Sequence, residues 1–169
     1  MANPDEELDT LLNDFETGKI PLLQFLKRLD AFKREYGLQH SERLGKAVIG
    51  SFGCHTEGRD LMAGLLEANG FRTVVAGRDT SIEDVVALCR DPEVTVLCLS
   101  VQTTYDCPEI LEASRLLEEE GIRDRIVLNI GGSPITQELS DRAGGDVFST
   151  TASGSARKIR EEVLRRTSE

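Results

Sequence analysis

Several residue types are scarce in this sequence, and each scarcity excludes a class of protein. The 169 residues include no tryptophan, two histidines and four cysteines, and no two of the cysteines form a CxxC pair. A zinc site is hard to build from so few imidazoles and thiols, and the cysteine spacing fits a reducing cytosol. No apolar run is long enough to span a bilayer, and the first ten residues are acidic rather than those of a signal peptide. We therefore expect a cytoplasmic protein that does not enter the membrane.

Basic residues are also in the minority. The 20 lysines and arginines are outnumbered by 30 aspartates and glutamates, which gives a net charge of −10. Such a balance argues against a nucleic-acid-binding surface. With 39% hydrophobic and 30% charged residues, the chain has the composition of a globular protein, and its length allows one domain to bury a core.

The first 45 residues have a helical pattern of their own. Apolar residues recur at helical spacing before a break at 17–21, namely Leu8, Leu11, Leu12 and Phe15. A second stripe follows the break, formed by Leu22, Phe25, Leu26, Leu29, Phe32 and Tyr36. Pro21 suits the first turn of this second helix, where no amide donor is needed. The pattern predicts a helical hairpin over residues 1–45 that packs on the main domain or on a partner.

From Lys46 onward, short β-rich runs alternate with helical segments. The predicted strands are 46–51, 71–76, 94–100, 125–130 and 146–149. The predicted helices are 58–69, 82–90, 108–120, 135–143 and 155–166. Ser81 before Glu83 and Asp84 resembles a helix cap. Strands without strict polar alternation, separated by helices, indicate a parallel sheet covered on both faces. We therefore expect an α/β domain at residues 46–169 with a flavodoxin-like (Rossmann-type), doubly wound, five-stranded parallel sheet.

Ligands of such a sheet bind at the carboxyl ends of the strands, so the loops there are the candidate binding site. A phospho-receiver site needs an acidic cluster after the first strand and an aspartate ending the third, but Gly53 and Ser100 occupy these positions. A flavodoxin phosphate loop needs more hydroxyl groups than the first loop has, and the GxGxxG spacing of a dinucleotide site is missing. These three site types are excluded.

The same loops resemble the cobalamin-binding domains of corrinoid proteins. That family carries D-x-H-x-x-G after the first strand, S-x-L with a nearby threonine after the third, and Gly-Gly after the fourth. The matching residues here are Gly53, Cys54, His55, Thr56, Glu57 and Gly58, then Ser100, Val101, Gln102 and Thr104, then Gly131 and Gly132. The resemblance covers roughly residues 46–166, nearly the whole α/β part.

The resemblance implies a role for each matched position. His55 would replace the cofactor's own benzimidazole as the lower axial ligand of cobalt, a role that suits neutral imidazole. Gly58 would let the displaced nucleotide tail pass close to the backbone, and Ser100 would hydrogen-bond the buried base. The other residues expected to contact cobalamin are Cys54, Thr56, Glu57, Thr104 near the lower corrin face, Gly131 and Gly132 along the tail, and Ser149 and Thr150 at its nucleotide end.

Two positions depart from the family pattern. Gly53 replaces the aspartate that hydrogen-bonds the far nitrogen of the ligand histidine, and this removes a partner that fixes the imidazole's tautomer and basicity. Gln102 replaces the leucine of S-x-L, which puts a polar residue beside the corrin. Either change would suit weaker binding, base-on binding or a site tuned for another purpose.

Three kinds of corrinoid protein fit these residues. Segments 66–71 and 131–136 are similar to methyl-carrier proteins, while Ile49, Gly50 and Ser51 before Cys54 and His55 are similar to the small subunit of glutamate mutase. A cobalamin-binding sensor that signals to a protein partner is the third. The family's methyl carriers place a four-helix cap before the domain, and residues 1–45 supply two helices.

No side chain has the setting of a catalytic acid or base, so the chemistry would come from cobalt and from a partner subunit. We therefore expect a component of a methyltransferase or mutase system rather than a complete enzyme. The sequence leaves open the methyl or adenosyl form of the cofactor and the oligomeric state, a homo-oligomer included.

Overall fold

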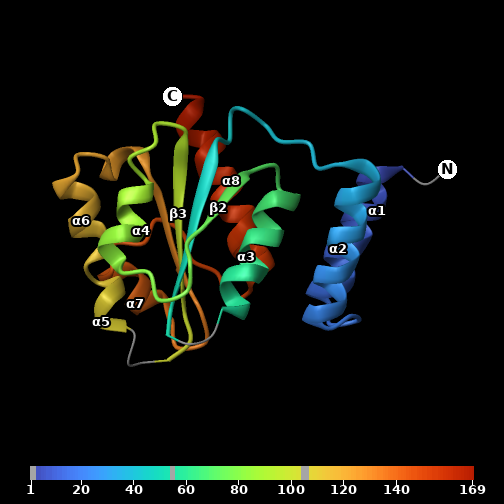
Figure 1. Cartoon of the computed structure of the whole chain (residues 1–169), viewed down its shortest axis with the longest axis horizontal. Coiled ribbons are helices and arrows are strands. Elements are labelled where there is room, and N and C mark those ends of the chain that lie inside the picture. Colours follow the sequence, from blue (N-terminus) through green and yellow to red (C-terminus); the bar gives the residue numbers. More distant parts are fainter. Residues whose placement is uncertain (1–2, 54–55, 104–106) are drawn as a thin grey trace.

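A four-stranded parallel sheet forms the centre of the molecule (Figure 1). The computed structural model describes residues 3–53, 56–103 and 107–169. The strands are β1 (Lys46–Phe52), β2 (Arg72–Val75), β3 (Val94–Val101) and β4 (Val127–Gly131). Their order is β2-β1-β3-β4. The chain adds β2 on one side of β1 and then adds β3 and β4 on the other side. The expected ligand site lies at the carboxyl ends of β1 and β3, where this change of side occurs.

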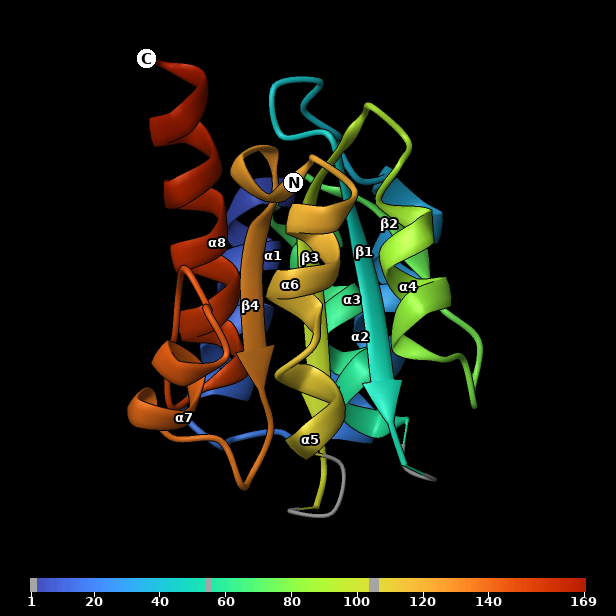
Figure 2. The same cartoon turned by 90° about the vertical axis from the view of Figure 1, so that its left-hand side faces the viewer.

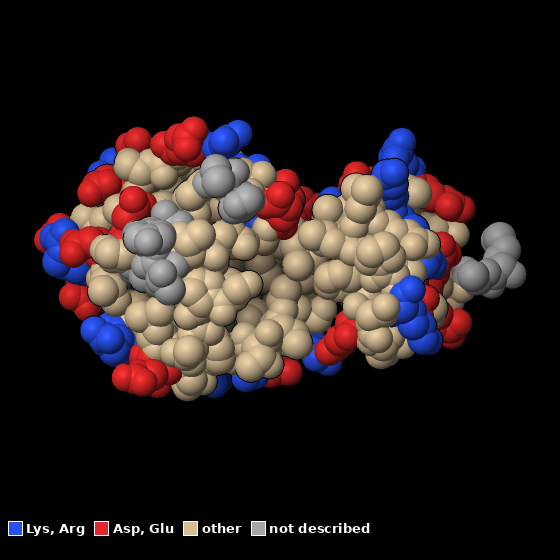
Figure 3. All heavy atoms as spheres, turned by 90° about the horizontal axis from the view of Figure 1, so that it is seen from below, with Lys and Arg blue, Asp and Glu red and all other residues tan. Residues whose placement is uncertain are grey.

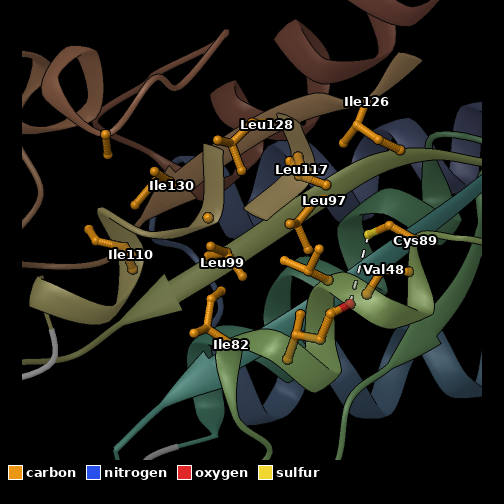
Figure 4. Packing of buried hydrophobic residues seen from close by; sticks show 14 of the residues in the cluster. Val48, Ile82, Cys89, Leu97, Leu99, Ile110, Leu117, Ile126, Leu128 and Ile130 are labelled. Atoms are coloured by element: carbon orange, nitrogen blue, oxygen red, sulfur yellow. Dashed lines mark hydrogen bonds between the residues drawn. The ribbon is translucent and has the colours of Figure 1, made fainter. Parts of the chain in front are cut away.

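Helices cover both faces of the sheet, which Figure 1 shows nearly edge-on and Figure 2 shows from one face. One face carries α3 (Glu57–Ala68) and α8 (Ala152–Thr167). The other carries α4 (Ile82–Leu88), α5 (Cys107–Ile110), α6 (Ala113–Glu119) and α7 (Gln137–Arg142), with a 3-10 turn at Arg123–Arg125. Each helix layer buries its own apolar cluster against the sheet. The cluster under α4 and α6 includes Leu97, Leu99 and Leu128 (Figure 4).

The N-terminal hairpin predicted from the two apolar stripes is present. It consists of α1 (Pro4–Glu16) and α2 (Leu22–Tyr36), and it packs outside α3. Phe25 and Leu29 are fully buried in the same apolar cluster as Leu65 of α3. The hairpin therefore adds a further layer to the core, and Pro21 is the N-cap of α2 rather than a residue of its first turn.

The predicted fifth strand at 146–149 is wrong. Within the described ranges this segment makes only one isolated parallel bridge, between Val147 and Asn129 of β4. The amide of Leu128 donates to the carboxylate of Asp146 at 2.8 Å, and Lys158 donates to the carbonyl oxygen of Phe148 at 2.7 Å. Side chains thus bond backbone amide and carbonyl groups that would pair with a neighbouring strand in a sheet, and the segment remains irregular.

The predicted helix at 108–120 is divided into α5 and α6. The amide of Glu112 bonds the carbonyl oxygen of Glu109 at 3.2 Å, which is the spacing of a tighter turn and interrupts the helix. The Ser81 cap is confirmed, because its side chain accepts a hydrogen bond from the amide of Asp84. Across the described residues, none of the helices combines the length and the apolar character needed to cross a membrane.

Candidate functional site

A cavity of about 420 Å³ opens at the carboxyl ends of β3 and β4, between the sheet and helices α3 and α8. Seven of the residues predicted from the sequence line it, namely Gly58, Ser100, Gln102, Gly131, Gly132, Ser149 and Thr150. They come from four separate segments of the chain. The register aligns Ser51, Ser100 and Gly131 across three neighbouring strands, which explains why distant motifs meet at this edge.

The remaining predicted residues do not belong to the described cavity wall. Gly53 is exposed just after β1, Thr56 is the N-cap of α3, and Glu57 is the first residue of that helix. Cys54, His55 and Thr104 lie outside the described residues. Their expected roles at the cobalt and at the lower corrin face therefore stay predictions.

Gly131, which ends β4, and Gly132, which follows it, are glycines for different reasons. Gly132 has a φ of +124°, and a Cβ there would run into the carbonyl group of Val101. At Gly131 the nearest atom to an added Cβ, Nδ2 of Asn129, is 4.0 Å away. The fold thus requires glycine at position 132, whereas at position 131 glycine keeps cavity space open.

Gly58, in the first turn of α3, lies against Ser100 of β3 and against Gln102, which follows that strand. An added Cβ would lie 2.8 Å from Nε2 of Gln102 and would contact Oγ of Ser100. Its lack of a side chain lets Ser100 and Gln102, both on the α3 side of β3, line the cavity. The glycine therefore shapes the cavity by close helix–strand packing.

The mouth of the cavity is polar and lies beside the start of α8. Thr151 caps this helix by accepting a hydrogen bond from the amide of Gly154 at 3.0 Å, and the amide of Thr151 is 3.3 Å from Oγ of Ser149. The first turn of α8 contains no acidic residue. The amide groups of a helix start attract anions, so this side of the mouth suits a negatively charged ligand group.

The inner part of the cavity is mostly apolar. Leu61 and Met62 of α3 line it together with Cys98 and Asn129 of the sheet. Burial raises the pKa of the Cys98 thiol to about 11, so this thiol is neutral at physiological pH. Asn129 was not among the residues predicted from the sequence, although a single polar residue inside an apolar parallel strand is a signal of a functional position.

Among the described residues, the surface around the carboxyl ends of the strands is largely uncharged (Figure 3). Lysine, arginine, aspartate and glutamate lie mainly around the periphery of this view, and a hollow separates the α/β body from the hairpin. The described residues contain no cluster of three or more His, Cys, Asp or Glu that could hold a metal ion. A site at this edge thus suits a large neutral or weakly charged ligand with an anionic tail.

Comparison with known proteins identifies the family of this chain. The model of the B12 binding domain matches residues 45–160. Trimethylamine corrinoid protein 1 of Methanosarcina acetivorans is 30% identical over 161 residues, which cover 89% of this chain and 74% of that protein.

Solved structures share the fold. The methanol:cobalamin methyltransferase complex MtaBC of Methanosarcina barkeri contains a chain with a TM-score of 0.75 and 22% identity, covering 95% of this chain and 68% of that one. The monomethylamine corrinoid protein of the same organism has a TM-score of 0.65 and 25% identity, covering 92% and 78%. The resemblance found in the loop motifs is confirmed, and the chain belongs to the B12-binding domain family of cobalamin-binding proteins.

Proposed function

We propose that this chain is the corrinoid-carrying component of a methyltransferase system and that it carries a methyl group on cobalt. The main observation behind the proposal is the cavity at the carboxyl ends of β3 and β4, which is lined by residues from three loop motifs of the family. Relatives named as trimethylamine corrinoid proteins support a methyl carrier over a mutase subunit or a sensor. They also favour a methylamine as the source of the methyl group.

The residues of the cavity fit the nucleotide tail of a corrinoid. A volume of about 420 Å³ lies in the range of small-molecule pockets, which suits a tail but leaves the corrin ring at the mouth. Leu61 and Met62 offer apolar contacts for a flat base, and Ser100 offers a hydroxyl. The polar mouth at Ser149 and Thr150, beside the start of α8, suits the ribose and phosphate.

Bound cobalamin would supply a cobalt ion able to accept and release a methyl group. The chain's own part is to hold and orient the cofactor. His55, as a neutral imidazole, is the proposed lower axial ligand of the cobalt.

Replacing His55 tests the proposed ligand. The wild type, His55→Ala and His40→Ala are loaded with hydroxocobalamin, desalted and compared for retained corrinoid. We expect His55→Ala to retain at least about tenfold less corrinoid than the wild type. Even residues that only hydrogen-bond a metal ligand change metal affinity about 10–100-fold. His40→Ala is a matched control, since His40 bonds the carbonyl oxygen of Phe71 and does not line the described cavity.

A spectroscopic measurement separates ligation from general damage. The reduced, cobalt(II) form is prepared with natural-abundance and with ¹⁵N-labelled protein, and the nitrogen splitting in its electron paramagnetic resonance spectrum is recorded. We expect labelling to change the splitting in the wild type and in His40→Ala. If labelling leaves the wild-type splitting unchanged, the axial nitrogen belongs to the cofactor and the His55 assignment is wrong.

Restoring the family's aspartate is a second test. Gly53→Asp is expected to tighten axial ligation, because a carboxylate on the far imidazole nitrogen raises ligand basicity, commonly with about 10–100-fold effects. Gly53 has a φ of +91°, so a side chain at this position strains the backbone and we expect a gain near the lower limit. Gly53→Asn is the matched control, with the same backbone cost and no negative charge. Equal affinities for the two variants would mean that another group already orients His55.

We also propose that a partner protein covers the upper face of the corrin. The organisation that we propose is a helical segment at residues 1–45 followed by a cobalamin-binding domain at 46–169, and the family match at 45–160 supports this boundary. The hairpin of α1 and α2 packs outside α3 and lies beside the carboxyl ends of the strands rather than over them. The loaded chain alone should therefore transfer methyl groups from methylamines only slowly, and a methylamine methyltransferase should raise the rate. Full turnover by the isolated chain would contradict this.

A further inference from the structure

The inner end of the cavity contains a polar group that the proposed function does not use. Asn129 lies in β4, is 1% exposed and lines the cavity. Its Nδ2 donates a hydrogen bond to Sγ of Cys98 at 3.2 Å. Its Oδ1 accepts no hydrogen bond from any of the described residues. A buried acceptor without a donor costs stability, so this oxygen needs an explanation beyond the fold.

The surroundings of Asn129 offer it no better partner. The neighbouring side chains on this face of the sheet belong to the apolar cluster that contains Val96, Val127 and Met62. Cys98 is a neutral thiol, and sulfur is a weak hydrogen-bond partner. An aliphatic residue of similar size would fill this position at lower cost to the empty protein. The amide is therefore better explained by a ligand than by packing.

The register of the sheet fixes how deep this group lies. Cys98 pairs with Asn129, and Ser100 pairs with Gly131, two residues nearer the mouth. Two residues of a strand correspond to roughly 7 Å. A tail that enters from the carboxyl ends of the strands reaches Ser100 first and Asn129 last. The group that meets Asn129 is then the far edge of the base, which is the terminal unit of the tail.

We infer that Asn129 selects the lower base of the corrinoid and favours a base whose far edge carries an O–H or N–H donor. This inference rests on the proposed function, because it requires the nucleotide tail to occupy the cavity. Oδ1 is buried in the empty protein, so a hydroxybenzimidazole or an aminopurine base donates to it once the side-chain amide of Asn129 turns toward the cavity. Dimethylbenzimidazole presents only methyl groups there and leaves the acceptor unpaired. Sites built around a polar partner reject analogues that lack it far more strongly than apolar pockets reject an extra methyl group.

The test compares three corrinoids that differ only in the lower base, which is 5-hydroxybenzimidazole, adenine or 5,6-dimethylbenzimidazole. Equilibrium dissociation constants are measured with the full-length protein by titration calorimetry and by absorbance. We expect the hydroxyl-bearing or the amino-bearing corrinoid, or both, to bind at least about tenfold more tightly than the dimethyl form. The two donor-bearing arms also distinguish a hydroxyl donor from an amino donor.

Asn129→Leu tests whether this residue causes the preference. We expect the variant to bind the dimethyl form more tightly than the wild type does and to lose the preference for donor-bearing bases. Thermal unfolding of the empty variant is recorded in parallel, and its midpoint should be equal or higher, because a buried unpaired acceptor has been removed. The base series on the wild type needs no variant and remains decisive if Asn129→Leu fails to fold.

The outcomes separate the two proposals. If none of the three corrinoids binds, the proposed function fails. If all three bind with equal affinity, or the dimethyl form binds best, the cavity still holds a corrinoid but Asn129 does not select its base. A preference that persists unchanged in Asn129→Leu also overturns the inference.

Discussion

Gly131→Ala is expected to weaken corrinoid binding about 10–100-fold while leaving the free energy of unfolding nearly unchanged. The added methyl group meets no described protein atom closer than 4.0 Å, so the empty protein has room for it. Gly131 lines the cavity, so the same methyl group would occupy space proposed for the nucleotide tail. Overfilling a packed site costs about 1–3 kcal/mol, which corresponds to this range of affinity.

Gly132→Ala, one residue further, is expected to act on the fold instead. Its Cβ would collide with the carbonyl group of Val101 at a φ of +124°. Backbone strain and overpacking together should destabilise the protein by about 3 kcal/mol. The two adjacent variants therefore form a matched pair, in which one probes the ligand site and the other probes the loop that builds it.

The pair is measured by denaturant unfolding without corrinoid and by corrinoid titration. Normal stability with weak binding for Gly131→Ala, and low stability for Gly132→Ala, is the expected pattern. Wild-type affinity in Gly131→Ala would place the tail elsewhere than in this cavity. Wild-type stability in Gly132→Ala would show that the loop after β4 can move away from Val101.

The alternation of short strands and helices was predictable because buried parallel strands are apolar along their whole length. The same criterion failed at residues 146–149, where Asp146 and Lys158 bond to backbone groups and the segment stays irregular. Hydrogen bonds from side chains to the backbone depend on the folded arrangement, so periodicity alone could not reveal them. The parallel direction of the remaining strands agrees with the prediction, and their order, β2-β1-β3-β4, is that of a doubly wound sheet.

Residues of the cavity wall could be predicted where a family motif marks them, and Asn129 was missed because only packing places it there. Ser100 and Gly131 belong to family motifs, and they meet because their strands are paired in register. Asn129 belongs to no motif, and its place on the cavity wall follows from the register of β3 and β4. Gly53, Thr56 and Glu57 are in a motif yet do not line the described cavity, because they lie at the end of β1 and the start of α3.

The apolar stripe of the hairpin left two possibilities, packing on the domain or on a partner. In the structure some of its residues are buried against α3 and others are exposed. Leu29 is 1% exposed and contacts α3, where an added Cβ at Gly64 would lie 3.0 Å from its Cδ2. Leu23 on the same helix is 64% exposed. The face with Phe25 and Leu29 therefore belongs to the core, and the face with Leu23 does not.

Leu29→Ala is accordingly expected to destabilise the whole protein by about 2–5 kcal/mol, because it removes a buried side chain and leaves a cavity between α2 and α3. For a chain of this size, that corresponds to a drop of roughly 5–15 °C in the midpoint of thermal unfolding. Leu23→Ala is the matched control, and a change at an exposed position should stay within about 0.5 kcal/mol.

The unfolding of Leu29→Ala is followed by circular dichroism and by calorimetry on the empty protein. A single, lower transition is expected, because the hairpin and α3 share one apolar cluster and should unfold together. Two separate transitions, with the second at the wild-type midpoint, would show that the hairpin folds independently of the α/β domain. In that case α1 and α2 could detach without loss of the corrinoid site, and the hairpin would be free to move when a partner protein approaches the corrin.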